Sequence, residues 1–322
     1  MAHEIEIVNG KASHFYVGQT PWHGLGTKLD SPPTIEEGIR AAGLDWRVGL
    51  KPLFTGDGES VDHRATYRMT DGKIFGVVGP GYTPLQNNDA FSWFQPLLDS
   101  GEVALHTAGA LQEGRKVWVL AKVNKPALEI ADGDMVERFV LLSNSHDGTR
   151  AVRVGFTPIR VVCANTLRMA HDASDEANRL VKVLHTKNVM GAIEGLRDMM
   201  QVANASFEAT AEQYRKLARF HVSKADMRKY VKVVLGVEKE DDGKLPAQTL
   251  TKIREILVLA EKGKGNDAPA VRGTLWAAYN GLTEYLGTSY GRSQDRRIDA
   301  LWFGQNATLS SKALEIAIAM AS

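Results

Sequence analysis

Four arginines lie close together near the middle of this 322-residue chain, and arginine in such a run is typical of contact with phosphate groups. They are Arg150, Arg153, Arg160 and Arg168, and no acidic residue interrupts the run before Asp172. The planar guanidinium group has five N–H donors and fits a phosphate better than the ammonium group of lysine does. The chemistry that this pattern predicts is the binding of a polyanion.

The sequence around the first three arginines predicts two strands joined by an elbow. Val152 and Val154 alternate with Arg153, which is the period-two pattern of a half-buried strand. Pro158 cannot donate a hydrogen bond to a neighbouring strand. We therefore expect the strand to stop, bulge or lie at a sheet edge at this proline.

A helix is predicted to follow the second strand. From Leu167 to Leu184 apolar residues recur at helical spacing, and Asn165 or Thr166 could cap the first turn through a side-chain oxygen. The N–H groups and the dipole at a helix N-terminus both favour anions. We expect the basic strand and this helix start, which carries Arg168, to form one rim of a groove.

Lysines and aromatic rings on neighbouring elements could complete the groove, with the rings as stacking faces for unpaired bases. Trp118 and Tyr82 are further candidates for stacking, although core packing is the alternative for each ring. For Arg160 and Arg168 the alternative is a structural ion pair with acids such as Asp172 or Glu176. The predicted nucleic-acid-binding residues are Lys116, Lys122, Arg150, Arg153, Arg160, Arg168 and Phe156.

The positive charge of the chain is concentrated in this central segment, although the net charge is only +1. Residues 1–149 contain 13 basic and 19 acidic residues, residues 150–232 contain 15 and 8, and residues 233–322 contain 11 of each. Such an excess is an electrostatic footprint for a polyanion. The alternative is that these charges form the solvated faces of amphipathic helices.

The composition limits the compartment and the type of site. The chain has no apolar run of roughly 18 residues, which a membrane span needs, and no secretory signal at its N-terminus. Its single cysteine, Cys163, excludes an internal disulfide framework and a cysteine-based zinc site. We expect Cys163 to be a buried thiol among apolar neighbours. We expect a cytoplasmic protein, in the host cell if it is phage-encoded, that makes no membrane contact.

Motifs for common catalytic and cofactor sites are missing from the sequence. Gly236–Lys244 has the wrong spacing for a phosphate-binding loop, and Gly79–Gly81 lacks the third glycine of a dinucleotide fingerprint. The nine histidines show no ligand spacing on one helix. We predict no cofactor, no catalytic residue and no metal ligand, and we favour a protein without enzymatic turnover. A metal site assembled across the fold stays open.

Several short segments resemble a family of phage- and plasmid-borne proteins, domain of unknown function 932. The central run Thr157–Leu167 (TPIRVVCANTL) is similar to the signature of that family. Pro21–Gly26, His185-Thr186 and Leu301–Gly304 are similar to it too, so the resemblance extends over nearly the whole chain. The family description implies no activity.

A second resemblance concerns the order of elements. The predicted helix, β-meander and helix of residues 88–184 are similar in order to the core of phage single-strand annealing proteins, the group that contains Red-beta. That resemblance covers about a third of the chain. It implies rings or helical filaments that hold single-stranded DNA in an outer basic groove without ATP.

The predicted fold is α+β, with an antiparallel β-meander flanked by helices in the N-terminal half and an all-helical C-terminal half. Residues 1–30 are expected to be irregular, and a helix should follow Thr34, which has capping-box spacing with Glu37. We divide the chain into a β-rich core domain with the basic strand–helix unit (1–187) and a helical domain (188–322). Strands are expected at 46–54, 65–69, 74–78, 103–111, 116–123, 137–144 and around Arg153, and helices at 89–98, 189–220, 224–235, 247–262, 273–286 and 309–321.

The leading hypothesis is an ATP-independent protein of the DNA annealing or recombination type that binds single-stranded DNA, or RNA. Repeating a weak site along an extended polymer increases affinity. We therefore expect a homo-oligomeric ring or filament, joined through an exposed strand edge or the apolar helix near residues 309–320. The alternatives are a metal-dependent nuclease or other hydrolase, and a phage accessory protein that binds a host protein.

Overall fold

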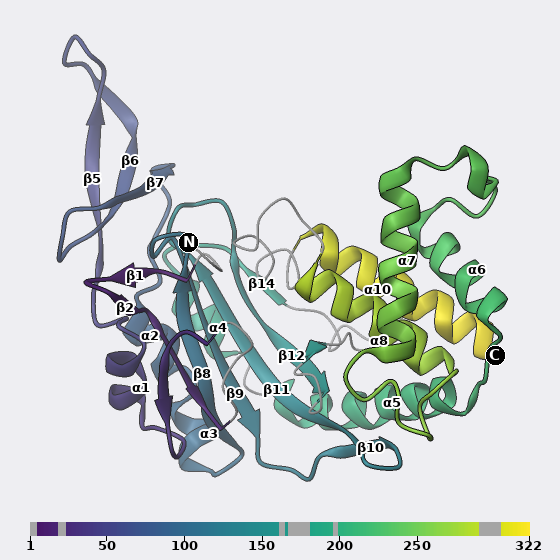
Figure 1. Ribbon diagram of the computed structural model, residues 1–322. Coiled ribbons are helices and arrows are strands. Elements are labelled where there is room, and N and C mark those ends of the chain that lie inside the picture. Colours follow the sequence, from purple (N-terminus) through teal and green to yellow (C-terminus); the bar gives the residue numbers. More distant parts are fainter. Residues whose placement is uncertain (1–4, 19–23, 161–164, 167–180, 196–198, 290–303) are drawn as a thin grey trace. The chain divides into compact units, whose positions relative to one another are not determined.

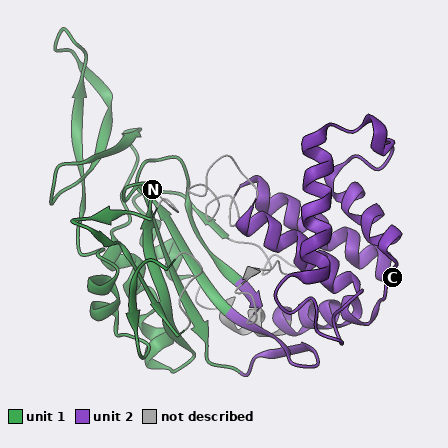
Figure 2. Ribbon diagram, viewed as in Figure 1, with its two compact units in different colours: residues 1–125, 139–156, 179–202 green, residues 126–138, 157–178, 203–322 purple. Residues whose placement is uncertain are grey.

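The computed structural model describes residues 5–18, 24–160, 165–166, 181–195, 199–289 and 304–322 (Figure 1). The fold is α+β, with sheets in the N-terminal half and helices in the C-terminal half, as predicted. The chain forms two compact units (Figure 2). Unit 1 contains residues 1–125, 139–156 and 179–202, and unit 2 contains residues 126–138, 157–178 and 203–322. The domain boundary predicted between residues 187 and 188 stays a prediction.

The N-terminal segment is not irregular, which corrects the expectation for residues 1–30. It contains four short strands, and β3 pairs antiparallel with β8 and parallel with β4. These strands have two to four residues each, so the sequence offers no alternation long enough to predict them. Their bounds are Ile7–Val8 (β1), Lys11–Ala12 (β2), His14–Val17 (β3) and Thr27–Leu29 (β4).

Helix α1 (Ile35–Ala41) begins as predicted. The Thr34 side chain accepts a hydrogen bond from the Glu37 N–H, and the Glu37 carboxylate accepts one from the Thr34 N–H, which is a complete capping box. The next predicted helix is divided into α2 (Asn87–Ser92) and α3 (Gln95–Asp99). Pro96 lies in the first turn of α3, and a proline cannot make the i to i−4 hydrogen bond of a continuous helix.

Unit 1 contains the smaller of two sheets and most of the larger one, whose residues 128–131, 134–138, 157–160 and 165–166 belong to unit 2. The smaller sheet is antiparallel and has the order β5 (Val48–Phe54), β6 (Ser60–Arg68) and β7 (Ile74–Val78). The large sheet has nine strands in the order β13-β12-β11-β9-β8-β3-β4, and β10 and β14 join it as partners of β11 and β12. The meander is therefore confirmed in part, because β8, β9, β11 and β12 are neighbours in chain order but further strands extend the sheet on both sides. Bounds are Val103–Leu111 (β8), Lys116–Val123 (β9), Leu128–Ala131 (β10), Asp134–Ser145 (β11) and Val152–Arg160 (β12).

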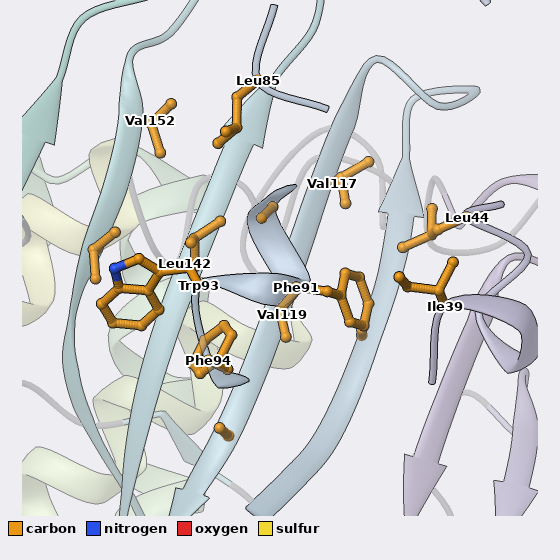
Figure 3. Close-up of a cluster of buried hydrophobic side chains, with 14 of the residues drawn as sticks. Ile39, Leu44, Leu85, Phe91, Trp93, Phe94, Val117, Val119, Leu142 and Val152 are labelled. Carbon is orange, nitrogen blue, oxygen red and sulfur yellow. The ribbon is translucent and has the colours of Figure 1, made fainter. Parts of the chain in front are cut away.

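One face of the large sheet carries the core of unit 1 (Figure 3). Alternate residues of the strands, such as Val117 and Val119 on β9 and Leu142 on β11, point into it. Helices α1 to α3 and the residues between α2 and α3 supply the opposing side chains, including Phe91 on α2 and Trp93 directly after it. The Trp93 indole also donates a hydrogen bond of 2.8 Å to the carbonyl of Ile193. The alternation of side chains along a strand fixes which residues face away from this core, although Trp118 and Leu120 on the other face of β9 are buried too.

The helix expected over residues 167–184 is wrong at its C-terminal end. Residues 165–166 form strand β13, and Val181–Val183 forms strand β14, which pairs antiparallel with Val152–Val154 of β12. Residues 167–180, which include Arg168, lie outside the described residues, as does Cys163. Lys182 lies between two valines, which is the alternation of a strand. The longer run of apolar residues at helical spacing includes these three residues, so the sequence predicted a helix there.

Strand β12 continues through Pro158 to Arg160, so the proline does not end it. On one side of β12, residues Val152–Val154 pair with β14, and Ile159 and Arg160 pair with β13. Pro158 lies between the residues that pair with β14 and those that pair with β13, so its missing N–H donor interrupts neither pairing.

Unit 2 contains most of the helices. Helices α6 and α7 have the predicted bounds, and Ser223 and left-handed Gly236 cap α6. The helix predicted over 189–220 is divided into α4, in unit 1, and α5. None of the helices in the described ranges is long and apolar enough to cross a membrane. Bounds are Val189–Glu194 (α4), Met199–Arg219 (α5), Lys224–Leu235 (α6), Ala247–Lys262 (α7), Leu275–Thr288 (α8) and Gln305–Ala321 (α10).

Candidate nucleic-acid interface

Arg160 is the last residue of β12 and has no exposed surface. Its Nε and Nη2 donate hydrogen bonds of 2.8 and 2.7 Å to the carboxylate of Asp134. Its Nη1 donates to Asn266 Oδ1 at 2.8 Å and to the carbonyl of Lys264 at 3.3 Å. Its Nη2 also donates to the carbonyl of Gly265 at 3.1 Å. All five N–H donors of this arginine therefore have acceptors inside unit 2.

The carboxylate of Asp134, the partner of Arg160, is also buried and hydrogen-bonded. Asp134 is 4% exposed and accepts a further hydrogen bond of 2.7 Å from the Trp276 indole. The geometry agrees with the structural alternative for Arg160, with Asp134 in place of the acids that the sequence suggested. A guanidinium whose donors are occupied and buried cannot reach a phosphate while this part of unit 2 stays folded. We therefore leave Arg160 out of the interface.

Basic residues lie together at one end of the large sheet, within unit 1. Lys116 begins β9 and is the register partner of Ser145, the last residue of β11. Arg153 lies near the start of the neighbouring strand β12, directly opposite Lys182 on β14. Arg150 lies in the connection between β11 and β12. We call Lys116, Arg150, Arg153 and Lys182 the basic sheet end.

The strand residues of the basic sheet end share one face. Val152, Val154 and Val183 point into the core of unit 1, so the intervening Arg153 and Lys182 point away from it. The same alternation places Lys116 next to inward-facing Val117 on the face opposite the core. Lys182 is exposed, Arg150 and Arg153 are half-buried, and Lys116 is buried. Exposure therefore increases towards β14.

The other predicted site residues are not part of this group. Lys122 is opposite Phe139, near the far end of β9, although alternation places it on the same face. Phe156 is half-buried and packs against the core, so it offers no open stacking face. Arg168 lies outside the described residues. The predicted set therefore combines Lys116, Arg150 and Arg153, which the fold brings together, with Lys122 and Phe156, which lie elsewhere.

The other two candidate stacking rings also pack against other side chains of the protein. Tyr82 stacks on His185 with 4.6 Å between ring centroids, and its hydroxyl donates a 3.0 Å hydrogen bond to the carbonyl of Ser145. Trp118 is 5% exposed, with its ring 5.4 Å from that of His14. None of the three predicted rings is therefore presented as an open face for bases, and phosphate contact remains the chemistry of this region.

An acidic turn borders the basic sheet end. The Asp147 carboxylate accepts hydrogen bonds from Ser145 Oγ at 2.5 Å and from the Thr149 backbone N–H at 2.9 Å. Burial alone would raise the pKa of this carboxyl, but these hydrogen bonds and the charge of Lys116 lower the pKa below its ordinary value. Asp147 therefore stays ionised, and it orders the connection that carries Arg150.

Two residues of these arrangements were missed from the sequence. Lys182 was assigned to a helix, although the valines on either side of it carry the signal of a strand. Asp134 is separated from Arg160 by 26 residues and from Trp276 by 142, so no local pattern connects them. Within the described residues, no three His, Cys, Asp or Glu side chains are grouped as a metal ion would require.

The chain matches a protein-family model, Domain of unknown function (DUF932), over residues 74–302. No curated protein matches the chain. No solved structure matches it either. The matched range includes β7 to β14, the basic sheet end and the Arg160–Asp134 pair. Because the match covers more than two thirds of the sequence, the chain belongs to the DUF932 family.

Proposed function

We propose that this protein binds single-stranded nucleic acid through phosphate contacts at the basic sheet end, and that it acts without ATP in a DNA annealing or recombination process. The observation that carries the proposal is the direct opposition of Arg153 and Lys182 on paired strands. Both side chains are on the face turned away from the core, and Lys182 is exposed.

Like charges directly opposite each other on neighbouring strands are destabilising. A phosphate backbone bound across β12 and β14 would lower that repulsion, since its charges repeat along the chain. Neighbouring strands are about 4.8 Å apart, so the cations of adjacent strands could contact successive phosphates. The neighbouring strands β8, β9, β11 and β12 are the meander part of the helix–meander–helix order by which the sequence resembles annealing proteins, and they support the same class of function.

The test is fluorescence anisotropy of a labelled, unstructured oligothymidine at several salt concentrations. Each phosphate contact to a single strand contributes roughly 0.7 to the slope of log affinity against log salt. We expect Arg153→Ala and Lys182→Ala each to weaken binding and to lower the slope by about that amount. Lys229→Ala on helix α6, an exposed lysine in unit 2, is the matched control and should leave both quantities unchanged.

Two further measurements define the class of ligand and the process. A duplex of the same length should compete less well than the single strand, and an RNA strand of matched sequence tests the choice of sugar. Annealing of complementary oligonucleotides should be accelerated in the absence of ATP. Wild-type protein that binds none of these ligands, or binding that both substitutions leave unchanged, would overturn the proposal.

A further inference from the structure

Strand β14 carries Lys182 of the basic sheet end, but its pairing with the sheet is short. Three residues, Val181, Lys182 and Val183, pair with β12, and within the described residues no other strand pairs with β14. Lys182 is also directly opposite Arg153, and like charges in that arrangement repel each other. Contacts outside the strand pairing should therefore hold β14 against β12.

Two such contacts lie at the end of the strand. Val183 packs into the core of unit 1, and His185, two residues further on, binds the segment before α2. The His185 carbonyl accepts a 2.9 Å hydrogen bond from the Thr83 N–H, and its ring Nδ1 donates one of 3.3 Å to the Thr83 carbonyl. The ring also stacks on that of Tyr82, with 4.6 Å between the centroids. We call His185, Tyr82 and Thr83 the clip.

The clip is fixed in turn to strand β11. The Tyr82 hydroxyl donates a 3.0 Å hydrogen bond to the carbonyl of Ser145, and Ser145 is the register partner of Lys116. Burial, together with the charge of Asp147, raises the pKa of Tyr82, so the phenol keeps the proton that this bond needs. A continuous set of contacts therefore connects Lys182 on β14 with Lys116 on β9.

His185 adds no charge to the basic sheet end. Its Nδ1 faces a carbonyl oxygen, which can only accept a hydrogen bond, so Nδ1 carries the ring proton. Burial lowers the pKa of His185, and the backbone carbonyls of Thr83 and Arg150 oppose this only in part. The ring is therefore neutral at pH 7. Since His185 is also only 8% exposed, it is not itself a phosphate ligand.

We propose that His185 is a positioning residue for the basic sheet end, whose contacts with Tyr82 and Thr83 hold β14 in register and so keep Lys182 beside Arg153 on one phosphate backbone. The effect on binding rests on the proposed function, whereas the positioning of β14 rests on the contacts of the clip alone. The competing account is that His185 contributes only to the overall stability of unit 1.

The first test needs no nucleic acid. Hydrogen–deuterium exchange, read by mass spectrometry on the full-length protein, follows a peptide that contains residues 181–188. His185→Ala removes the ring and leaves the backbone bond to Thr83. We expect this peptide to exchange about tenfold faster, because one hydrogen bond and one ring stack no longer oppose local opening. Tyr82→Phe keeps the stack and loses the bond to Ser145, so its exchange should lie between those of the wild type and His185→Ala.

The second test is the binding of labelled oligothymidine at neutral pH and several salt concentrations. His185→Ala should weaken binding by the same factor as Lys182→Ala and lower the salt slope by about 0.7, although it removes no charge. Combined with Lys182→Ala it should weaken binding no further, because both changes remove the same phosphate contact. Combined with Arg153→Ala it should bind more weakly than either single variant.

Val103→Ala is the matched control for lost stability. Val103 is 2% exposed in the core at the start of β8 and belongs neither to the clip nor to the basic sheet end. Its substitution should lower the melting temperature and leave both the affinity and the salt slope unchanged. Circular dichroism checks each variant, and where His185→Ala does not fold, Tyr82→Phe provides the same comparison.

The outcomes separate this inference from the proposed function. Unchanged exchange of residues 181–188 in His185→Ala would overturn the inference, whatever the protein binds. Faster exchange with an unchanged salt slope, in a protein whose wild type binds the oligonucleotide, would overturn it too. A wild type that binds no nucleic acid would overturn the proposed function and with it the role of His185 in binding, while faster exchange would still support the positioning of β14.

Discussion

At the scale of single residues, the pair of Arg160 and Asp134 shows how burial decides the role of a charge. A buried ion pair contributes stability only when its remaining donors and acceptors are also satisfied. Here the loop carbonyls of Lys264 and Gly265, the Asn266 amide and the Trp276 indole complete the set. The same arginine in an exposed groove would be free to bind phosphate.

This difference predicts a large loss of stability for one arginine substitution on β12 and a small change for another. Arg160→Ala should lower the free energy of unfolding by roughly 3–5 kcal/mol, because it leaves the Asp134 charge buried and unpaired. Arg160→Lys should also destabilise, since three ammonium donors cannot replace five in a planar fork. Arg153→Ala, at a half-buried position, should change stability by at most about 1 kcal/mol.

Urea unfolding of the three variants measures these differences. Equal, small losses for Arg160→Ala and Arg153→Ala would show that the buried pair has no special role. A large loss for Arg153→Ala would mean that this residue, too, is mainly structural.

His146 predicts a dependence of stability on pH. Its Nε2 donates a 3.0 Å hydrogen bond to Asn87 Oδ1, because the Asn87 amide nitrogen already donates to the carbonyl of Leu44. Burial, supported by the charges of His185 and Arg68 and opposed by Asp147, lowers the pKa of His146 from 6.5 to about 3. The folded protein therefore keeps this ring neutral, whereas the unfolded chain binds a proton below pH 6.5.

Unfolding thus takes up a proton in this range, and stability is lost as the pH falls from 6.5 towards 3. The expected contribution is about 1.4 kcal/mol per pH unit. Carboxyl groups also titrate at low pH, so the measurement is the difference between wild type and His146→Phe in urea unfolding from neutral pH to about pH 5. Parallel pH profiles of the two proteins would contradict the assignment.

At the scale of elements, two glycines on one helix predict opposite effects of the same substitution. A Cβ at Gly281 of α8 would lie 2.6 Å from the Cα of Ala260 on α7, so the two helix backbones touch there. A Cβ at Gly287 would meet no atom within 4 Å. Gly281→Ala should destabilise by roughly 1–3 kcal/mol through overpacking, whereas Gly287→Ala should stabilise by up to about 1 kcal/mol through helix propensity.

Thermal unfolding of both variants, with the wild type as reference, distinguishes packing from propensity. Stabilisation by Gly281→Ala would mean that α7 and α8 can separate without cost. Destabilisation by Gly287→Ala would show that helix propensity does not determine the change in stability at that position.

Elements with strong local signals were predictable from the sequence. Strands β7, β8 and β9 and helices α6 and α7 have the predicted bounds, because alternation, caps and turn residues act over a few positions. Short elements were not predictable. Strands β1 to β4 and β14 have only two to four residues each, and a local pattern of that length is too brief to identify a strand, whether its partner is near, as for β1 and β2, or distant, as for β3 and β8.

The candidate site was only partly predictable for the same reason. The clustering of Arg150 and Arg153 follows from their spacing, but the sheet register brings Lys182 opposite Arg153 and tertiary contacts bury Arg160. Charge spacing along the sequence shows which residues could bind phosphate. It does not show which of them the fold leaves accessible.

At the scale of the whole molecule, the division into units predicts the behaviour of a fragment. Unit 2 includes residues 126–138 and 157–178, so a fragment of residues 188–322 lacks both Asp134 and Arg160. It would leave the Trp276 indole and the Asn266 amide oxygen without their partners. We expect this fragment to unfold at a lower temperature and less cooperatively than one that begins at residue 126.

Calorimetry of the two fragments measures the difference. Equal melting temperatures would show that the helices of unit 2 are stable without strands β10 to β12, and would support the boundary at residue 187.

The wide separation of Asp134, Arg160 and Trp276 in the sequence has a consequence for synthesis on the ribosome. At about 5–20 residues per second, roughly 6–23 s pass between the addition of Arg160 and that of Trp276. Throughout this interval Asp134 and Arg160 lack the Trp276 indole that completes their hydrogen bonds in the folded protein. Such non-local contacts slow folding, so exposed strands of this protein should be clients of ribosome-associated chaperones until the last helices emerge.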